Sequence, residues 1–213
     1  MSTHLPETTS DFFQFAIHVI NAAIIAFSFE LIKDDFIPFE LINSFSELVN
    51  FIAVLFVWGF LISGWVGYTK SINEKPHKEG LIGNLRFVTE LVISFFMLYL
   101  FIIVDKDKFE IYFGSAFLWV IPAIFGLFII WDILKSYEYR NEYERRRMVL
   151  TIFISIAILI LDLFYNLYAG NLIAGFTLDK NWTFIAMIAA GSAIIGTYRV
   201  FKGNLSGPEV QIY

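Results

Sequence analysis

One aspartate lies deep inside an apolar stretch of the sequence, where an ionisable side chain is costly. Within the run 148–168, Asp162 is the most deeply placed acid of the chain, and Thr151, Ser155 and Asn166 share its face at helical spacing. A charged group inside a bilayer costs about 2.5–3.5 kcal/mol. The face therefore indicates a cation or proton site that Asn166 assists. The alternative is a carboxyl group neutralised by a proton or by a neighbouring donor.

A second polar face occurs in the apolar run 11–31. Its members are Asp11, Gln14, His18, Asn21 and Ser28. Their spacing of three, four or seven residues places them on one narrow side of a helix. We expect His18 and Asn21 to line an aqueous path or a binding cavity. The alternative is that they form hydrogen bonds with neighbouring helices inside a bundle.

Acids also occur near the ends of other apolar runs. Glu90 follows Arg86 by four residues, a spacing that predicts an ion pair within one helix. We also count Glu90 among the candidate path-lining residues. Asp132 lies near the end of another run, so a membrane enzyme acting on lipid is a further alternative. Because no nucleophile is paired with a base, we predict that the protein is not an enzyme.

The remaining chemistry-bearing residues predict no cofactor and no metal. The chain has no cysteine and three histidines, of which only His18 lies in an apolar run. A haem held between two histidines needs a second one at the same depth, and three scattered histidines form no metal cluster. The net charge of −5 is spread over loops of both signs and does not indicate nucleic-acid binding.

Six apolar runs must position these residues. They cover 11–31, 49–68, 84–104, 111–134, 148–168 and 182–201, in a chain of 213 residues that is 58% hydrophobic. Each run is close to the length of about 20 residues that crosses a bilayer as a helix, and each is too long and too continuously apolar for a barrel strand. We predict an all-α integral membrane bundle of six helices that forms one transmembrane domain.

Lysine and arginine are distributed unequally between the two sides of this bundle. One side holds Lys70, Lys75, Lys78, Arg86, Lys135, Arg140, Arg145, Arg146, Arg147, Arg199 and Lys202, and the other holds Lys33, Lys106, Lys108 and Lys180. Basic loops stay in the cytoplasm. With six spans, both termini are then cytoplasmic. The N-terminal residues lack the features of a signal peptide, and we expect the protein in the cytoplasmic membrane of a prokaryote.

The basic segment 135–147 is rich in helix formers and has no glycine or proline. We expect the two spans that it joins to extend into the cytoplasm as a helical hairpin. Arg145, Arg146 and Arg147 would then contact anionic lipid headgroups. Binding of a protein or a nucleotide is the alternative for this segment.

Small residues recur four apart in the last span, at Ala189, Ala193 and Thr197 among others. Such faces allow two helices to approach closely. We expect this face to pack against another helix, either within the bundle or in a homo-oligomer.

Two functional hypotheses follow from these patterns. The first is a small ion or proton channel or transporter whose path is lined by the polar faces of the runs 11–31 and 148–168. His18, Asn21, Asp162 and Asn166 lie on these faces, and Glu90 of the run 84–104 is a further lining residue. The second is a non-transport membrane anchor, scaffold or signalling partner that acts through the segment 135–147. In the second case the polar faces only hold the helices together.

The absence of cysteine makes the predicted topology directly testable. With Cys introduced singly in place of Lys75 or Glu142, we expect labelling by an impermeant thiol reagent only after the membrane is opened, because both positions lie in basic loops. Labelling of either position from outside intact cells would reverse the orientation.

Overall fold

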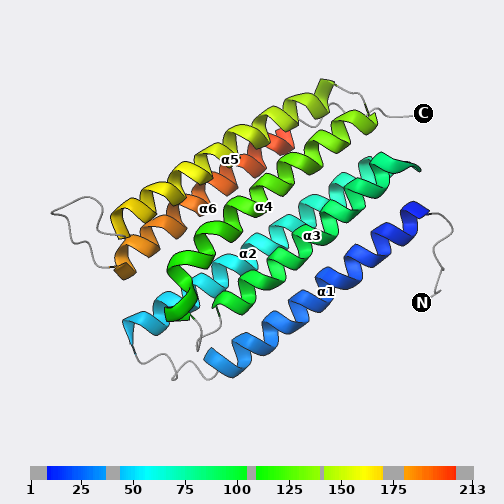
Figure 1. Cartoon of the computed structure of the whole chain (residues 1–213). Helices are drawn as coiled ribbons and strands as arrows, with labels where there is room; N and C mark the ends of the chain where they lie inside the picture. The colour runs from blue at the N-terminus through cyan, green and yellow to red at the C-terminus, as the bar shows by residue number, and fades with distance from the viewer. Residues whose placement is uncertain (1–8, 37–43, 105–108, 140–141, 170–179, 205–213) are drawn as a thin grey trace. The chain divides into compact units, whose positions relative to one another are not determined.

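The protein is all-helical in its computed structural model, which describes residues 9–36, 44–104, 109–139, 142–169 and 180–204 (Figure 1). No strand occurs among these residues. The helices are α1 (Thr9–Phe36), α2 (Phe45–Glu74), α3 (Leu81–Val104), α4 (Phe109–Tyr139), α5 (Glu142–Ala169) and α6 (Lys180–Asn204).

All six helices are long and apolar enough to cross a membrane, and their spanning stretches run from 20 to 28 residues. The predicted six-helix class is thereby confirmed. The helices are longer than the predicted apolar runs, and α2 shows why. It begins with a capping box, in which Glu47 N–H donates to Ser44 Oγ (3.2 Å) and Ser44 N–H donates to Glu47 Oε2 (3.0 Å). Such polar helix ends carry no hydropathy signal.

The chain divides into two compact units, residues 1–120 (unit 1) and residues 121–213 (unit 2), and each is described by itself. In unit 1, α1, α2 and α3 all pack against one another. Their buried apolar residues include Ile17, Ile24, Val54, Val57, Phe60, Leu61, Met97, Leu100 and Phe101. The core of unit 1 is therefore shared by three helices, and α1 contributes to it with the same side that carries its polar residues.

Unit 2 is built around the packing of α5 against α6. Its buried apolar residues include Ile124, Phe125, Ile158, Phe184, Met187, Ile188 and Ile195. Helix α4 continues to Tyr139 and α5 begins at Glu142. Both helices therefore extend into the segment 135–147, as predicted, while residues 140–141 lie outside the described ones.

The small-residue face of α6 lies on the exposed side of that helix. Ala189, Ala193 and Thr197 are exposed, and a methyl group added at Gly196 would meet no atom within 4 Å. The side of α6 that is buried in unit 2 carries larger residues, such as Met187 and Ile195. Packing of this face inside unit 2 is therefore not observed, and its use in a homo-oligomer stays a prediction.

We expect Ala193→Leu to leave the stability of the protomer within about 0.5 kcal/mol of the parent, since an exposed substitution breaks no packed contact. The same change should reduce the fraction of oligomers, because a larger side chain prevents close helix approach. Thermal unfolding and light scattering in detergent measure the two effects. Gly191→Leu, at a buried position of α6, is the control that should lower the unfolding temperature. An unchanged oligomeric state in Ala193→Leu would assign this face to lipid.

Candidate functional site

The polar face of α1 is the side that packs against α2 and α3 in unit 1. Three side-chain hydrogen bonds join it to these helices: Gln14 Nε2 donates to Asn73 Oδ1 (3.1 Å), Trp65 Nε1 donates to His18 Nδ1 (2.9 Å) and Ser94 Oγ donates to Asn21 Oδ1 (3.3 Å). Ser28 is also buried, and its hydroxyl donates to the Ile25 carbonyl (2.7 Å). The predicted polar face is present, and it links α1 to both neighbours.

These contacts give His18 and Asn21 hydrogen-bond partners inside the protein. Asn21 is buried at 6% exposure, and His18 is half-buried. Inter-helix hydrogen bonds of this kind are the ordinary use of polar side chains in an apolar bundle. The geometry therefore favours the packing alternative for α1, while the lining of a path by His18 and Asn21 stays a prediction.

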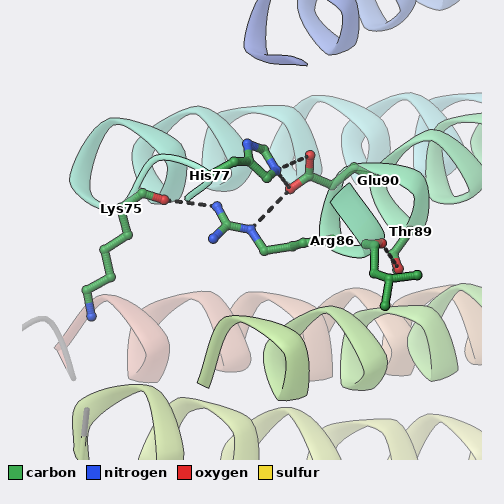
Figure 2. Close-up of polar contacts among 6 residues, drawn as sticks. Lys75, His77, Arg86, Thr89 and Glu90 are labelled. Atoms are coloured by element: carbon green, nitrogen blue, oxygen red, sulfur yellow. Dashed lines mark hydrogen bonds and ion pairs between the residues drawn. The ribbon is translucent and has the colours of Figure 1, made fainter. Parts of the chain in front are cut away.

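A short connection, residues 75–80, turns the chain from α2 into α3. Pro76 cannot continue a helix, and its ring excludes helical backbone at Lys75, where φ is −145° and ψ is 82°. Gly80 has φ +122°, a conformation that a side chain disfavours, and its carbonyl accepts the Asn84 N–H (3.1 Å). This turn brings His77 beside α3 (Figure 2).

His77, Arg86 and Glu90 form a buried ionic group, here named the His77 cluster (Figure 2). The His77 Nε2 atom lies 3.0 Å from Glu90 Oε2 and 3.1 Å from Glu90 Oε1. Arg86 Nε lies 3.7 Å from Glu90 Oε1, and Arg86 Nη2 donates to the Lys75 carbonyl (2.9 Å). The His77 and Arg86 side chains are 0% exposed and the Glu90 side chain is 3% exposed. The cluster thus fastens the α2–α3 turn to α3 without contact with solvent.

Aromatic rings enclose the His77 cluster. Phe13 of α1 stacks on Phe87 of α3 with ring centroids 4.0 Å apart, and the His77 ring meets Phe13 edge-on at 5.6 Å. The Tyr68 side chain lies beside Glu90. His77 Nδ1 is buried and has no hydrogen-bond partner among the described residues. Since Nε2 faces a carboxylate, the geometry fits the tautomer with its hydrogen on Nε2.

The pairing of Arg86 with Glu90 was expected from their spacing and is confirmed. The participation of His77 in this cluster was not expected, because the sequence places this residue in a loop beyond the apolar runs. The sequence feature that could have predicted it is the short, proline-containing turn, which returns the chain directly onto the first turns of α3. Whether Glu90 also lines a path stays a prediction.

In unit 2 the polar face of α5 packs toward α4 and α6. Thr151 Oγ1 forms a short hydrogen bond to Asp132 Oδ2 of α4 and lies 2.9 Å from the Tyr198 hydroxyl of α6. Ser155 Oγ donates to the Thr151 carbonyl (2.7 Å) and lies within 3.4 Å of the Phe125 carbonyl of α4. Asp132 and Thr151 are each 1% exposed. The polar face of α5 is therefore hydrogen-bonded to both α4 and α6.

Asp162 lies on this buried side of α5 but has a different environment. The residue is 4% exposed, and its Oδ2 atom has no hydrogen-bond partner among the described residues. Asn166 lies in α5 one turn further on, but its side chain is outside the described ones, so its predicted assistance to Asp162 stays a prediction. Asp162 is a buried acid whose second oxygen lacks a donor in the described part of the chain.

The basic run at the start of α5 is only partly on the surface. Arg145 and Arg146 are exposed, whereas Arg147 is buried at 7% exposure. Contact of these arginines with anionic lipid headgroups stays a prediction. Of the three, only Arg145 and Arg146 expose their side chains for such a contact. Among the described residues, no three histidine or acidic side chains are grouped as metal ligands require.

Comparison of the chain with protein-family models, with curated proteins and with solved structures gives no match.

We expect Glu90→Gln to destabilise the protein by about 3–5 kcal/mol, because it leaves the Arg86 cation buried without its anion. The measurement is the unfolding midpoint in detergent. Faster tryptic cleavage after Lys78 would locate the loosening at the turn.

The matched control is Glu74→Gln in the solvent-exposed pair Lys70–Glu74. This pair has the same i,i+4 spacing at 4.0 Å, with side chains 62% and 37% exposed. Loss of the Lys70–Glu74 ion pair should lower the free energy of unfolding by at most about 1 kcal/mol. Equal effects of the two changes would contradict a stabilising part for the His77 cluster.

Proposed function

We propose that the protein is a multi-pass membrane protein that moves a proton or a small cation across the bilayer, with Asp162 as the site that carries it. One observation carries this proposal: Asp162 is almost fully buried in a helix that is apolar enough to span a membrane, and Oδ2 has no partner among the described residues.

The physical reason is the cost of leaving that carboxylate alone. A carboxylate without donors in an apolar interior is expensive, and a proton or a bound cation removes the cost. The other buried acids in the described part of the chain, Glu90 and Asp132, have donors in contact with them. Asp162 is therefore the acid that most needs an exchangeable positive partner. Reversible gain and loss of such a partner is the elementary step of transport.

A non-transport anchor or scaffold is the second candidate, and two observations favour it. The α1 side chains once expected to line a path are engaged in hydrogen bonds to α2 and α3. Arg145 and Arg146 are exposed beside the α4–α5 connection, where they can bind anionic lipid or an acidic partner. In this alternative, Asp162 is a neutral structural residue.

The substitution Asp162→Asn separates the two candidates. The amide has the same size and removes only the exchangeable charge, so we expect the unfolding temperature to be unchanged or raised. Flux should fall by about 100-fold or more, the scale on which one positioned proton-transfer group contributes. Purified protein in liposomes, with an internal pH dye and with imposed proton, sodium or potassium gradients, provides the measurement.

Glu30→Gln, an exposed acid near the end of α1, is the control and should transport as the parent does. Parental flux through a folded Asp162→Asn protein would remove Asp162 from the mechanism. Absence of any flux in the parent under all three gradients would favour the anchor.

A further inference from the structure

An open groove of about 640 Å³ lies along the last turns of α2 in unit 1, and it is here named the α2 groove. The residues that line it form two neighbouring rows with a spacing of four along the helix. The first row is Trp65, Thr69 and Asn73, and the second is Val66, Lys70 and Glu74. The α2 groove belongs to unit 1 and Asp162 to unit 2, so a ligand of the groove is independent of the transport proposed above.

The first row of the α2 groove is held in place by hydrogen bonds. Trp65 Nε1 donates to His18 Nδ1 of α1 (2.9 Å), and Gln14 Nε2 of α1 donates to Asn73 Oδ1 (3.1 Å). Thr69 Oγ1 donates to the Trp65 carbonyl (2.9 Å). The indole N–H of Trp65 is thus satisfied inside the protein, and its apolar ring is available to a ligand. A wall that is fixed before a ligand arrives lowers the entropic cost of binding.

The second row of the α2 groove is exposed and changes from apolar to charged along the helix. Val66 is 63% exposed, and the side chains of Lys70 and Glu74 are 62% and 37% exposed. Lys70 Nζ lies 4.0 Å from Glu74 Oε1, which is long for a charge-assisted hydrogen bond. Because an ammonium group has three hydrogens to donate, Lys70 can bind a further anion and keep Glu74 as its neighbour.

The α2 groove lies where the membrane-spanning stretch of α2 ends, at Glu74. Tryptophan is enriched at the boundary between acyl chains and headgroups, and Trp65 is at the apolar end of the groove. Lys70 follows Val66 by one helical turn, and Glu74 follows Lys70 by another, about 6 Å each at 1.5 Å per residue. A phospholipid has the same order along its length, with an apolar chain, then a phosphate, then the outer part of the headgroup.

The two charges of the α2 groove select the kind of headgroup. The Lys70 ammonium complements a phosphate, and the Glu74 carboxylate complements a cation one turn further out. An ethanolamine headgroup carries its phosphate and its primary ammonium on either side of a short ethylene link, in this order. A choline headgroup has methyl groups in place of the N–H donors, and a glycerol headgroup leaves the Glu74 carboxylate without a cation. The groove is therefore complementary to ethanolamine and less so to the other two.

We propose that the α2 groove binds one phospholipid with an ethanolamine headgroup. An acyl chain of this lipid lies along Trp65 and Val66, its phosphate binds Lys70, and its ammonium donates to Glu74. This site differs from the predicted contact of anionic lipid with Arg145 and Arg146, both in the helix that forms it and in the charge of the headgroup. It does not depend on the proposed function, because a protein that moves no ion can hold the same lipid.

The test is a lipid titration of the delipidated protein in detergent, followed by native mass spectrometry. The probes are phosphatidylethanolamine, phosphatidylcholine and phosphatidylglycerol with identical acyl chains. We expect the parent to retain one phosphatidylethanolamine with an affinity about three- to fivefold above that for either other lipid, the scale of one partly exposed charge contact. Glycerophosphoethanolamine, which has the headgroup without the acyl chains, should not compete, because the apolar part of the contact is lost.

Two variants separate the two charge contacts. Lys70→Gln should lower the affinity for phosphatidylethanolamine by about three- to fivefold, and Glu74→Gln should abolish the preference for phosphatidylethanolamine over phosphatidylglycerol. Lys78→Gln and Glu79→Gln are the matched controls, because they remove the same charges from exposed positions in the turn that follows α2. Both controls should bind the lipids as the parent does, since they alter the general electrostatic field at this end of α2 and leave the groove intact.

Several results would overturn the lipid site. A parent that retains no lipid, or that binds phosphatidylcholine as tightly as phosphatidylethanolamine, contradicts a headgroup contact at Glu74. A preference of the parent for phosphatidylglycerol shows a general attraction of anionic lipid by basic residues, as do equal losses in Lys70→Gln and Lys78→Gln. Effective competition by glycerophosphoethanolamine assigns the groove to a soluble ligand in place of a membrane lipid.

Discussion

A polar group buried among apolar helices has no water to bond with, and this constraint acts on the buried charged side chains in the described part of the chain. The His77 cluster is its strictest case. Arg86 and Glu90 are buried together on one turn of α3, and each reaches a partner in the α2–α3 turn, the Lys75 carbonyl and His77 respectively. A single unmatched charge in that position would cost several kcal/mol, so the turn and the helix depend on each other.

The sequence predicts the helices well because length and hydropathy are local properties. It also predicts which side of a helix is polar, since Asn21 and Thr151 both lie on buried faces as helical spacing requires. The partners of these residues were not predicted. Ser94 for Asn21 and Asp132 for Thr151 come from other helices. Helix rotation and register set such pairs, and neither quantity is encoded in the periodicity of one segment.

The grouping of α1 with α5 as the walls of one path came from their similar patterns. In the structure each polar face is buried within its own unit, by α2 and α3 for α1 and by α4 and α6 for α5. Polar residues with similar helical spacing on α1 and α5 therefore have different surroundings in the structure. The α1 side chains act as hydrogen-bonding links between helices, whereas the α5 face also carries Asp162, whose Oδ2 atom has no hydrogen-bond partner among the described residues. The proposed transport chemistry accordingly resides in unit 2.

The three buried acids among the described residues differ in what surrounds them. Glu90 is matched by a cation and an imidazole. Asp132 accepts a short hydrogen bond from the Thr151 hydroxyl, which links α4 to α5. Asp162 has an oxygen without any donor among the described residues, so its stability depends on what it binds. A carboxylate that is matched by donors or cations stabilises a fold, whereas one with an unmatched oxygen gains stability from the positive partner that it binds. This difference is the reason that the transport proposal rests on Asp162 and not on the other two acids.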